Sequence, residues 1–196
     1  IGSCVAATMY HVGMGPLVLV DDFRHKKEKK INWEQVPATC VDREYFFEWV
    51  VGKEHEIKAV VHLGARTDTT EMDRRIFDHL NLRYSQQMWR FCTVNEIPMV
   101  YASSAATYGE GELGFVDDHA LIPQLHPLNP YGESKNEFDK WVLEQPAAPT
   151  FWAGLKFFNV YGPNEYHKGR MGSVILHAYR QILANGTLKL FRSHRP

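Results

Sequence analysis

The chain has 196 residues, of which 44% are hydrophobic and 23% are charged, the usual balance of a globular protein with one domain or one domain and part of another. A net charge of −1 argues against the strong field that nucleic-acid or anionic-membrane partners favour, and neither is predicted. Three scattered cysteines are too few for a disulfide framework or a zinc site, so we predict no metal and a reducing, cytoplasmic location. No apolar run approaches the roughly 20 residues of a membrane span.

Predicted helices and strands alternate along the chain. Periodicity and boundary residues indicate helices over 3–12, 43–53, 72–95, 130–144 and 173–184, and strands over 17–20, 38–41, 58–63, 98–102 and 153–160. The strands are apolar throughout, which is typical of a parallel sheet covered on both faces. We therefore predict an α/β fold with a doubly wound, Rossmann-like parallel sheet, in which ligands bind beyond the carboxyl ends of the strands.

Two short stretches carry the candidate chemistry. Ser103 and Ser104 follow the strand over 98–102, and Tyr131 precedes Lys135 by four residues at the start of a predicted helix. Residues four apart share one face of a helix, and a neighbouring ammonium is expected to lower the pKa of the phenol, which then serves as an acid or base. A serine hydroxyl at the strand end can bind the same substrate oxygen. The set is suited to oxidising and reducing a sugar alcohol beside a nicotinamide ring.

Around these residues the sequence resembles the extended short-chain dehydrogenase/reductase family, and within it the ADP-glycero-manno-heptose 6-epimerases. The similarity covers essentially the whole chain, and the stretches that match best are 62–65, 69–71, 101–109, 127–135 and 157–169. Phe158-Asn159-Val160-Tyr161-Gly162-Pro163 is common to many sugar-nucleotide enzymes, whereas the continuation His167-Lys168-Gly169 is much narrower. The resemblance implies inversion at C6 of the heptose in ADP-heptose, through a 6-keto intermediate, for lipopolysaccharide core precursors.

Site residues follow from the resemblance by position. It implies that Ser104, Tyr131, Lys135 and Lys168 are catalytic, with Lys168 as a second acid/base. A second proton donor is useful because hydride must leave one face of C6 and return to the other, so that the sugar binds in two orientations. Predicted substrate contacts are Ser104, Asn159, Arg170, His177, Phe191, Arg192, Ser193 and His194.

The resemblance also implies a tightly bound nicotinamide cofactor. Predicted contacts are Ile1, Asp21, Asp22, Lys29, Arg43, Leu63, Gly64, Ala65, Arg66, Asn81, Lys135 and Val160. Asp21, which directly follows the strand over 17–20, is suited to the ribose hydroxyls of NAD. Lys26, Lys27 or Lys29 would instead hold the 2′-phosphate of NADP. NADP is the prediction and NAD the alternative.

The domain organisation is predicted from the same comparison. Residues 1–160 are expected to form a dinucleotide-binding domain that lacks its first strand and most of its glycine-rich turn, and 161–196 the start of a truncated sugar-nucleotide lobe. Homo-oligomers, specifically pentamers, are implied. Two other readings stay open: another nucleotide-sugar 4-epimerase or dehydratase, and a non-catalytic nucleotide-sensing module. Ser104-Ala105-Ala106 stands where a dehydratase needs an Asp-Glu pair, which weighs against that enzyme.

Overall fold

The computed structural model describes residues 1–24 and 33–190, which form two compact units. One unit combines Ile1–Cys40 with the segment from Asn159 onward, and the other comprises Val41–Phe158. The predicted boundary after residue 160 is near the second junction, but the division into a cofactor domain and a substrate lobe stays a prediction.

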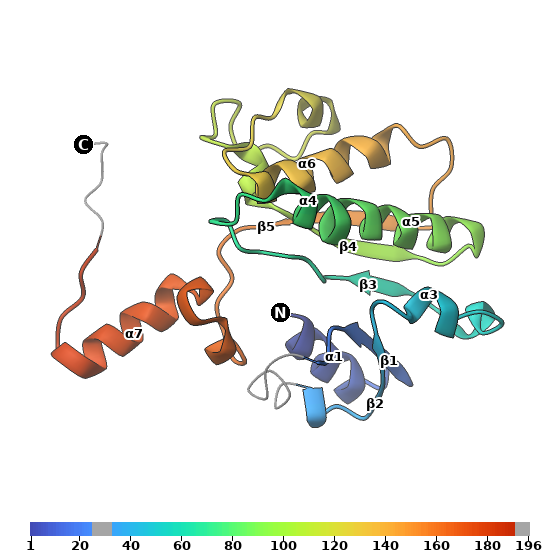
Figure 1. Ribbon diagram of the computed structural model, residues 1–196, viewed down its shortest axis with the longest axis horizontal. Helices are drawn as coiled ribbons and strands as arrows, with labels where there is room; N and C mark the ends of the chain where they lie inside the picture. Colours follow the sequence, from blue (N-terminus) through green and yellow to red (C-terminus); the bar gives the residue numbers. More distant parts are fainter. Residues whose placement is uncertain (25–32, 191–196) are drawn as a thin grey trace. The chain divides into compact units, whose positions relative to one another are not determined.

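The unit Val41–Phe158 is built on a parallel sheet (Figure 1). The strands β3 (Val60–His62), β4 (Met99–Ser104) and β5 (Trp152–Phe157) lie in that order, with β4 in the centre. The register pairs Val60 with Met99 and Ser104 with Phe157. The parallel arrangement is confirmed, although β3 is half as long as the apolar run that predicted it.

Helices α5 and α6 lie on one face of this sheet (Figure 1). Burial in β4 alternates, with Met99, Tyr101 and Ser103 buried under the helices and the residues between them half-buried. Val61 and Leu155 are partly exposed on the neighbouring strands. Within this unit the strands are therefore buried on one side more than the other, although their sequences are apolar throughout.

The long helix predicted over 72–95 is helical but not uniform. It runs through α4 (Arg74–Phe77), a π-helical segment η2 (Asp78–Arg83) and α5 (Tyr84–Val94). Along this helix the polar side chains of Asn81 and Ser85 are buried together with Phe77 and Met88. A single turn of π-helix of this kind is often found where a side chain is aimed at a functional site.

Helix α6 (Pro130–Leu143) begins where the sequence predicts, because Asn129 caps it by accepting a hydrogen bond from the Gly132 amide at 2.8 Å. Gly132 also permits a close approach. A Cβ atom there would stand 2.8 Å from the carbonyl oxygen of Ala106, in the short helix η3 (Ala105–Tyr108) that follows β4. The absence of a side chain thus brings the first turn of α6 against the segment after Ser104.

The rest of this unit is mostly irregular. The helix predicted over 43–53 is reduced to α3 (Phe46–Trp49), followed by the short helix η1 (Glu54–Glu56), because Gly52 breaks it with a φ of 78°. The predicted loop over 109–127 contains one further short helix, η4 (His119–Gln124). Gly109 opens that loop with a φ of 60°, and a Cβ there would clash with the carbonyl of His126.

The other unit contains α1 (Gly2–His11) and a two-stranded sheet of β1 (Leu17–Asp21) and β2 (Ala38–Asp42). Its later segment forms the short helix η5 (Tyr166–Met171) and α7 (Val174–Asn185). Ser173 caps α7 through the Leu176 amide at 3.1 Å, and Gly186 ends it in the left-handed conformation, as the sequence predicts. None of the helices within 1–24 and 33–190 has the length and apolar character to cross a membrane.

Candidate active site

Ser104 and Tyr131 lie together in the unit Val41–Phe158. Ser104 is the buried last residue of β4, and Tyr131 is in the first turn of α6. The Ser104 Oγ accepts a hydrogen bond from the Ala106 amide at 3.1 Å, which fixes the serine side chain. Burial raises the pKa of Tyr131 above its usual value, while a hydrogen bond with Ser104 opposes that rise. The sequence predicted this pair correctly as neighbours.

Lys135 is one helical turn after Tyr131 and is 5% exposed. Its Nζ donates a hydrogen bond to the carbonyl oxygen of Ala102 at 2.8 Å. Burial lowers the pKa of Lys135 to about 8, although the Asp139 carboxylate opposes that shift. A fully buried ammonium with this pKa is charged for most molecules at neutral pH and can lose its proton in mild alkali.

The structure contradicts the predicted effect of Lys135 on the pKa of Tyr131. The sequence predicted that the ammonium would lower the pKa of the phenol, but the pKa of Tyr131 is raised. Burial is the larger influence on the phenol, and the ammonium is directed to the Ala102 carbonyl. The neutral phenol is therefore the stable form of Tyr131 in this structure.

Asn81 ties the segment after β3 to α6. Its Oδ1 accepts a hydrogen bond from the Arg66 amide at 2.7 Å, and its Nδ2 donates to the Arg66 carbonyl and to Ser134 Oγ, both at 3.0 Å. The segment with Leu63, Gly64 and Ala65 thus leaves the carboxyl end of β3 with its course set by one buried amide. The Arg66 guanidinium forms ion pairs with Asp68 and Glu71, at 3.5 Å each.

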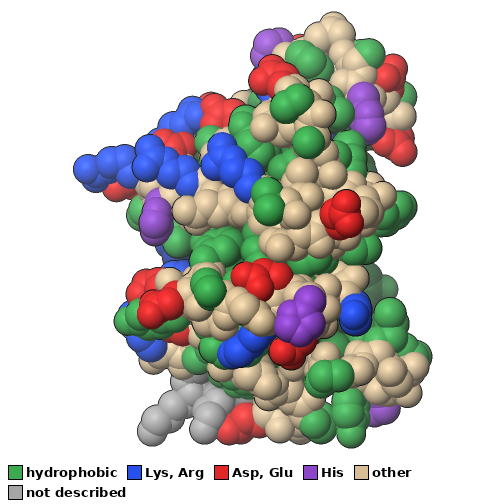
Figure 2. Space-filling view, turned by 90° about the vertical axis from the view of Figure 1, so that its right-hand side faces the viewer, with side chains coloured by type: hydrophobic (Ala, Val, Ile, Leu, Met, Phe, Trp, Pro, Cys, Tyr) green, Lys and Arg blue, Asp and Glu red, His purple; other side chains and the backbone are tan. Residues whose placement is uncertain are grey.

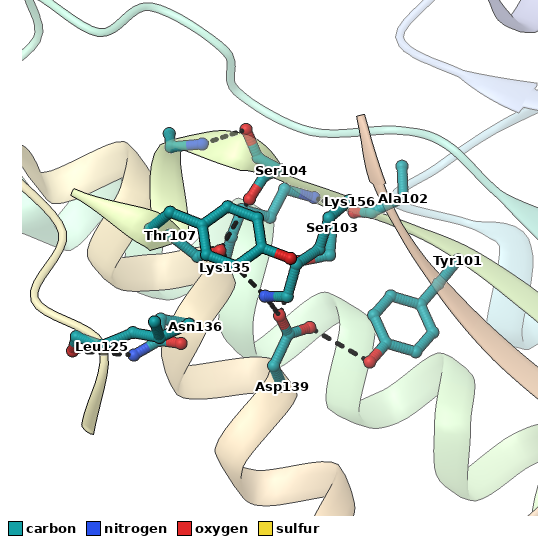
Figure 3. A network of polar contacts seen from close by, with 12 residues as sticks. Tyr101, Ala102, Ser103, Ser104, Thr107, Leu125, Lys135, Asn136, Asp139 and Lys156 are labelled. Carbon is teal, nitrogen blue, oxygen red and sulfur yellow. Dashed lines mark hydrogen bonds and ion pairs between the residues drawn. The ribbon is translucent and has the colours of Figure 1, made fainter. Parts of the chain in front are cut away.

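A buried polar network lies beside these residues and was not predicted (Figure 3). Asp139 on α6 accepts hydrogen bonds from Tyr101 and Ser103 of β4 and forms an ion pair with Lys156 of β5. Two sequence signals were available: Asp139 follows Lys135 by four residues, and Lys156 interrupts an otherwise apolar strand.

The remaining predicted cofactor contacts are divided between the units. The first unit is the one that contains Ile1–Cys40 and the segment from Asn159 onward, and the second unit is Val41–Phe158. In the first unit Ile1 is the N-cap of α1, and Asp21 ends β1, with its Oδ1 accepting from the Asp22 amide at 2.7 Å. Asp22 also pairs with Arg24. In the second unit the charge of Arg43 opposes the burial that raises the pKa of Tyr84 to about 12. Lys26, Lys27 and Lys29 lie outside the described residues.

Lys168 is on η5 of the first unit, on a segment held by Glu165. The Glu165 carboxylate accepts hydrogen bonds from the Ser173 amide at 2.7 Å, the Ser173 hydroxyl at 2.8 Å and the Gly162 amide at 3.4 Å. The Lys168 amide donates to the Glu165 carbonyl at 3.0 Å. Glu165 is therefore a further residue that sequence reasoning missed, and it sets the path of the loop that carries Lys168.

The predicted substrate contacts have different outcomes. The His177 ring and the Arg170 carbonyl are 3.4 Å apart, so these two lie side by side in the first unit with Asn159 and Val160 elsewhere on the same segment. Phe191, Arg192, Ser193 and His194 lie outside the described residues. The convergence of the first unit's residues on Tyr131 stays a prediction.

Charges of both signs are mixed with apolar side chains on the face in Figure 2, apart from a group of Lys and Arg at its upper left. Among residues 1–24 and 33–190, no three His, Cys, Asp or Glu side chains are arranged to hold a metal ion.

The sequence is similar to curated enzymes of one kind. It is 44% identical over 200 residues to the ADP-L-glycero-D-manno-heptose-6-epimerase of Fusobacterium nucleatum, and 42% identical over 198 residues to that of Nitratidesulfovibrio vulgaris. These alignments cover all of this chain but 60% and 61% of the relatives. The chain therefore spans about three fifths of the length of the relatives it matches.

Solved structures match the fold. The ADP-L-glycero-D-manno-heptose-6-epimerase of Helicobacter pylori superposes with a TM-score of 0.80 at 25% identity, over 97% of this chain and 62% of that one. The UDP-glucose 4-epimerase of Thermotoga maritima has a TM-score of 0.75 at 21% identity, over the same shares, which indicates the fold alone. The predicted Rossmann-like α/β fold is confirmed.

A family model agrees with the site and the fold. The model described as the NAD dependent epimerase/dehydratase family matches residues 22–196, which include β4, α6 and every predicted catalytic residue. With parallel strands, a serine at the end of β4 and a Tyr–Lys pair on α6, the chain belongs to the NAD-dependent epimerase/dehydratase family.

Proposed function

We propose that the whole protein interconverts ADP-D-glycero-manno-heptose and ADP-L-glycero-manno-heptose by oxidation and reduction at C6. The observation that carries the proposal is that the Ser104 side chain lies close enough to Tyr131 to influence its pKa, with Lys135 buried one turn further along α6. The names of the relatives that are 42% and 44% identical support the heptose as substrate. The product would serve lipopolysaccharide core synthesis.

Proton transfer is assigned to the side chains of this pair. Tyr131 takes the C6 hydroxyl proton when the alcohol is oxidised and returns a proton to the oxygen when the ketone is reduced. Ser104 donates a hydrogen bond to the same oxygen and orients it. Because burial favours the neutral phenol, Tyr131 takes this proton only as its minor phenolate form, which is a strong base. We assign to the Lys135 ammonium the positive charge of this part of the site.

A bound nicotinamide cofactor would accept hydride from C6 and return it to the opposite face of the same carbon. The donor set of this chain fits such a group, since Lys135 presents a buried ammonium at the Ala102 carbonyl near the end of β4, and Asn81 holds Arg66 in the segment that follows β3. Solved neighbours in complex with NAD support a nicotinamide cofactor. We propose NADP, with NAD as the alternative.

Inversion also requires a proton donor for the second orientation of the sugar. We assign this role to Lys168, on the segment that Glu165 holds. Asn159, Arg170 and His177 would contact the substrate. The proposal includes a homo-oligomer, specifically a pentamer, which the resemblance to these epimerases supports.

The test is direct observation of inversion. The whole protein is incubated with ADP-D-glycero-manno-heptose, and the C6 proton is followed by NMR while the released cofactor is identified after acid denaturation. Inversion is expected, and Tyr131→Phe should lower turnover by about 10² to 10⁴ because it removes the acid/base group. Tyr45→Phe, an exposed phenol, is the matched control.

Two outcomes would contradict the assignment. Turnover of UDP-glucose at C4 without turnover of ADP-heptose would favour a 4-epimerase. Cofactor binding without any sugar turnover, in a protein that binds ADP-heptose, would favour a nucleotide-sensing module.

A further inference from the structure

Two charged side chains in the unit Val41–Phe158 take no part in the proposed mechanism. The carboxylate of Asp139 and the ammonium of Lys156 are 2.7 Å apart, and their side chains are 3% and 17% exposed. Removing two charges from water costs several kcal/mol per ion, and an apolar pair of similar size is often as stable. Their presence in a core next to the site therefore calls for a role beyond stability.

Asp139 connects α6 to both neighbouring strands (Figure 3). Its Oδ1 accepts a hydrogen bond from the Tyr101 hydroxyl at 3.0 Å, and its Oδ2 accepts from the Ser103 hydroxyl at 2.6 Å and from Lys156. Tyr101 and Ser103 are the alternate inward residues of β4 that lead up to Ser104. The carboxylate thus fixes the last residues of β4 before Ser104, the serine assigned to catalysis.

Lys156 extends the network to the serine itself. Its Nζ also donates to Thr107 Oγ1 at 2.8 Å, and the Thr107 hydroxyl donates to the Ser104 carbonyl at 2.7 Å. The ammonium is 5.3 Å from the centre of the Tyr108 ring. A continuous path of polar contacts therefore runs from Asp139 through Lys156 and Thr107 to the backbone of Ser104.

We propose that Asp139 and Lys156 are a pair of positioning residues that hold the end of β4 and together set the charge carried by Lys135. The inference rests on the proposed function, in which Lys135 must remain an ammonium beside Tyr131. Asp139 supplies negative charge one helical turn from Lys135, and Lys156 limits that charge by pairing with it.

The charged groups around Lys135 can be assigned to their elements. Asp139 influences Lys135 from one turn further along α6. On β3, burial and the charge of Lys135 lower the pKa of the His62 imidazole to about 3. Lys156 on β5 stands beyond Asp139. Because His62 is neutral, Asp139 and Lys156 are the two charges of this network that substitution can change without altering the acid/base residues.

Changing either member of the pair should move the titration of Lys135 in opposite directions. Asp139→Asn keeps the shape and removes the negative charge, so Lys135 should lose its proton at lower pH, by about one unit or more. Lys156→Met removes the cation that pairs with Asp139, so the full negative charge of Asp139 acts on Lys135. The titration of Lys135 should therefore move to higher pH. Lys156→Arg keeps the cation and should restore the native value.

The experiment is a pH titration of the whole protein labelled with ¹³C at lysine Cε and observed by NMR. The Lys135 resonance is assigned by its absence from Lys135→Met, and Lys140→Met on the same helix is the control for lysine replacement. The pH dependence of turnover is measured in parallel, and its alkaline limb should move with the resonance.

The two variants separate a charge effect from a structural one. Equal shifts in one direction, or lowered turnover with an unmoved titration, would overturn the inference. If Asp139→Asn does not fold, the comparison of Lys156→Met with Lys156→Arg decides, since equal titrations in those two variants would contradict it. A wild-type protein that shows no turnover contradicts the proposed function, whereas the titration still tests the charge pair.

Discussion

At the scale of single residues, the proposed inversion depends on Lys168 as well as on Tyr131. A side chain that serves only one orientation of the sugar cannot reprotonate the oxygen in the other. Lys168→Ala should therefore lower heptose inversion by about 10² or more while the protein still binds cofactor and substrate. Turnover measured by NMR, together with ADP-heptose affinity by calorimetry, checks this expectation.

Lys140→Ala, which removes a half-buried lysine of α6, is the comparison for Lys168→Ala. It should leave turnover unchanged. Unaltered inversion in Lys168→Ala would remove Lys168 from the mechanism and favour an enzyme in which Tyr131 reaches the oxygen in both orientations.

At the scale of elements, the buried Asn81 of η2 joins the segment after β3 to α6. Asn81→Ala leaves the Arg66 amide, the Arg66 carbonyl and Ser134 without this partner, which should lower the free energy of unfolding by about 2 kcal/mol or more. It should also weaken cofactor binding, because the segment 63–66 loses its tether. Urea unfolding and cofactor titration measure the two effects.

The same helix offers a matched control for Asn81→Ala. Asn95 is exposed and donates only to the Phe91 carbonyl at 2.9 Å, so Asn95→Ala should cost a few tenths of a kcal/mol and leave cofactor binding intact. Equal losses in the two variants would show that Asn81 acts no differently from a surface amide.

At the scale of the whole molecule, stability in acid should depend on His62. Burial and then the charge of Lys135 lower the pKa of His62 to about 3, whereas an unfolded histidine titrates near 6.5. Its stabilising contribution is complete above pH 6.5 and is lost as the pH falls toward 3, because the unfolded state binds the proton first. Between pH 6.5 and 4 the loss should be about 3 kcal/mol, measured by urea unfolding at each pH.

The comparison that isolates this effect uses two histidine variants. His62→Gln should lose less stability than the native protein over the same pH range, whereas His55→Gln, at an exposed site, should follow the native curve. Parallel curves for all three proteins would mean that His62 is accessible to protons in the folded state.

Much of this organisation could be predicted from the sequence because it depends on local order. The caps at Asn129 and Ser173, the apolar strand before Ser104 and the four-residue step from Tyr131 to Lys135 act over one or two turns of chain. The helix over 43–53 was predicted too long: its aromatic spacing favours a helix, but only Phe46–Trp49 is α-helical, and Gly52 beyond it has a φ of 78°.

Other features depend on contacts between residues that are distant in the chain. The sequence by itself determined the order of strands and helices along the chain, because side-chain periodicity and capping are local properties. It also yielded the residues to which we assign the chemistry. Only the tertiary structure decided that the pKa of Tyr131 is raised rather than lowered, that Asn81 is buried, and that Asp139 pairs with Lys156. These outcomes depend on burial and on charges brought together by folding, and the strength of both is set by the low-dielectric surroundings that packing creates.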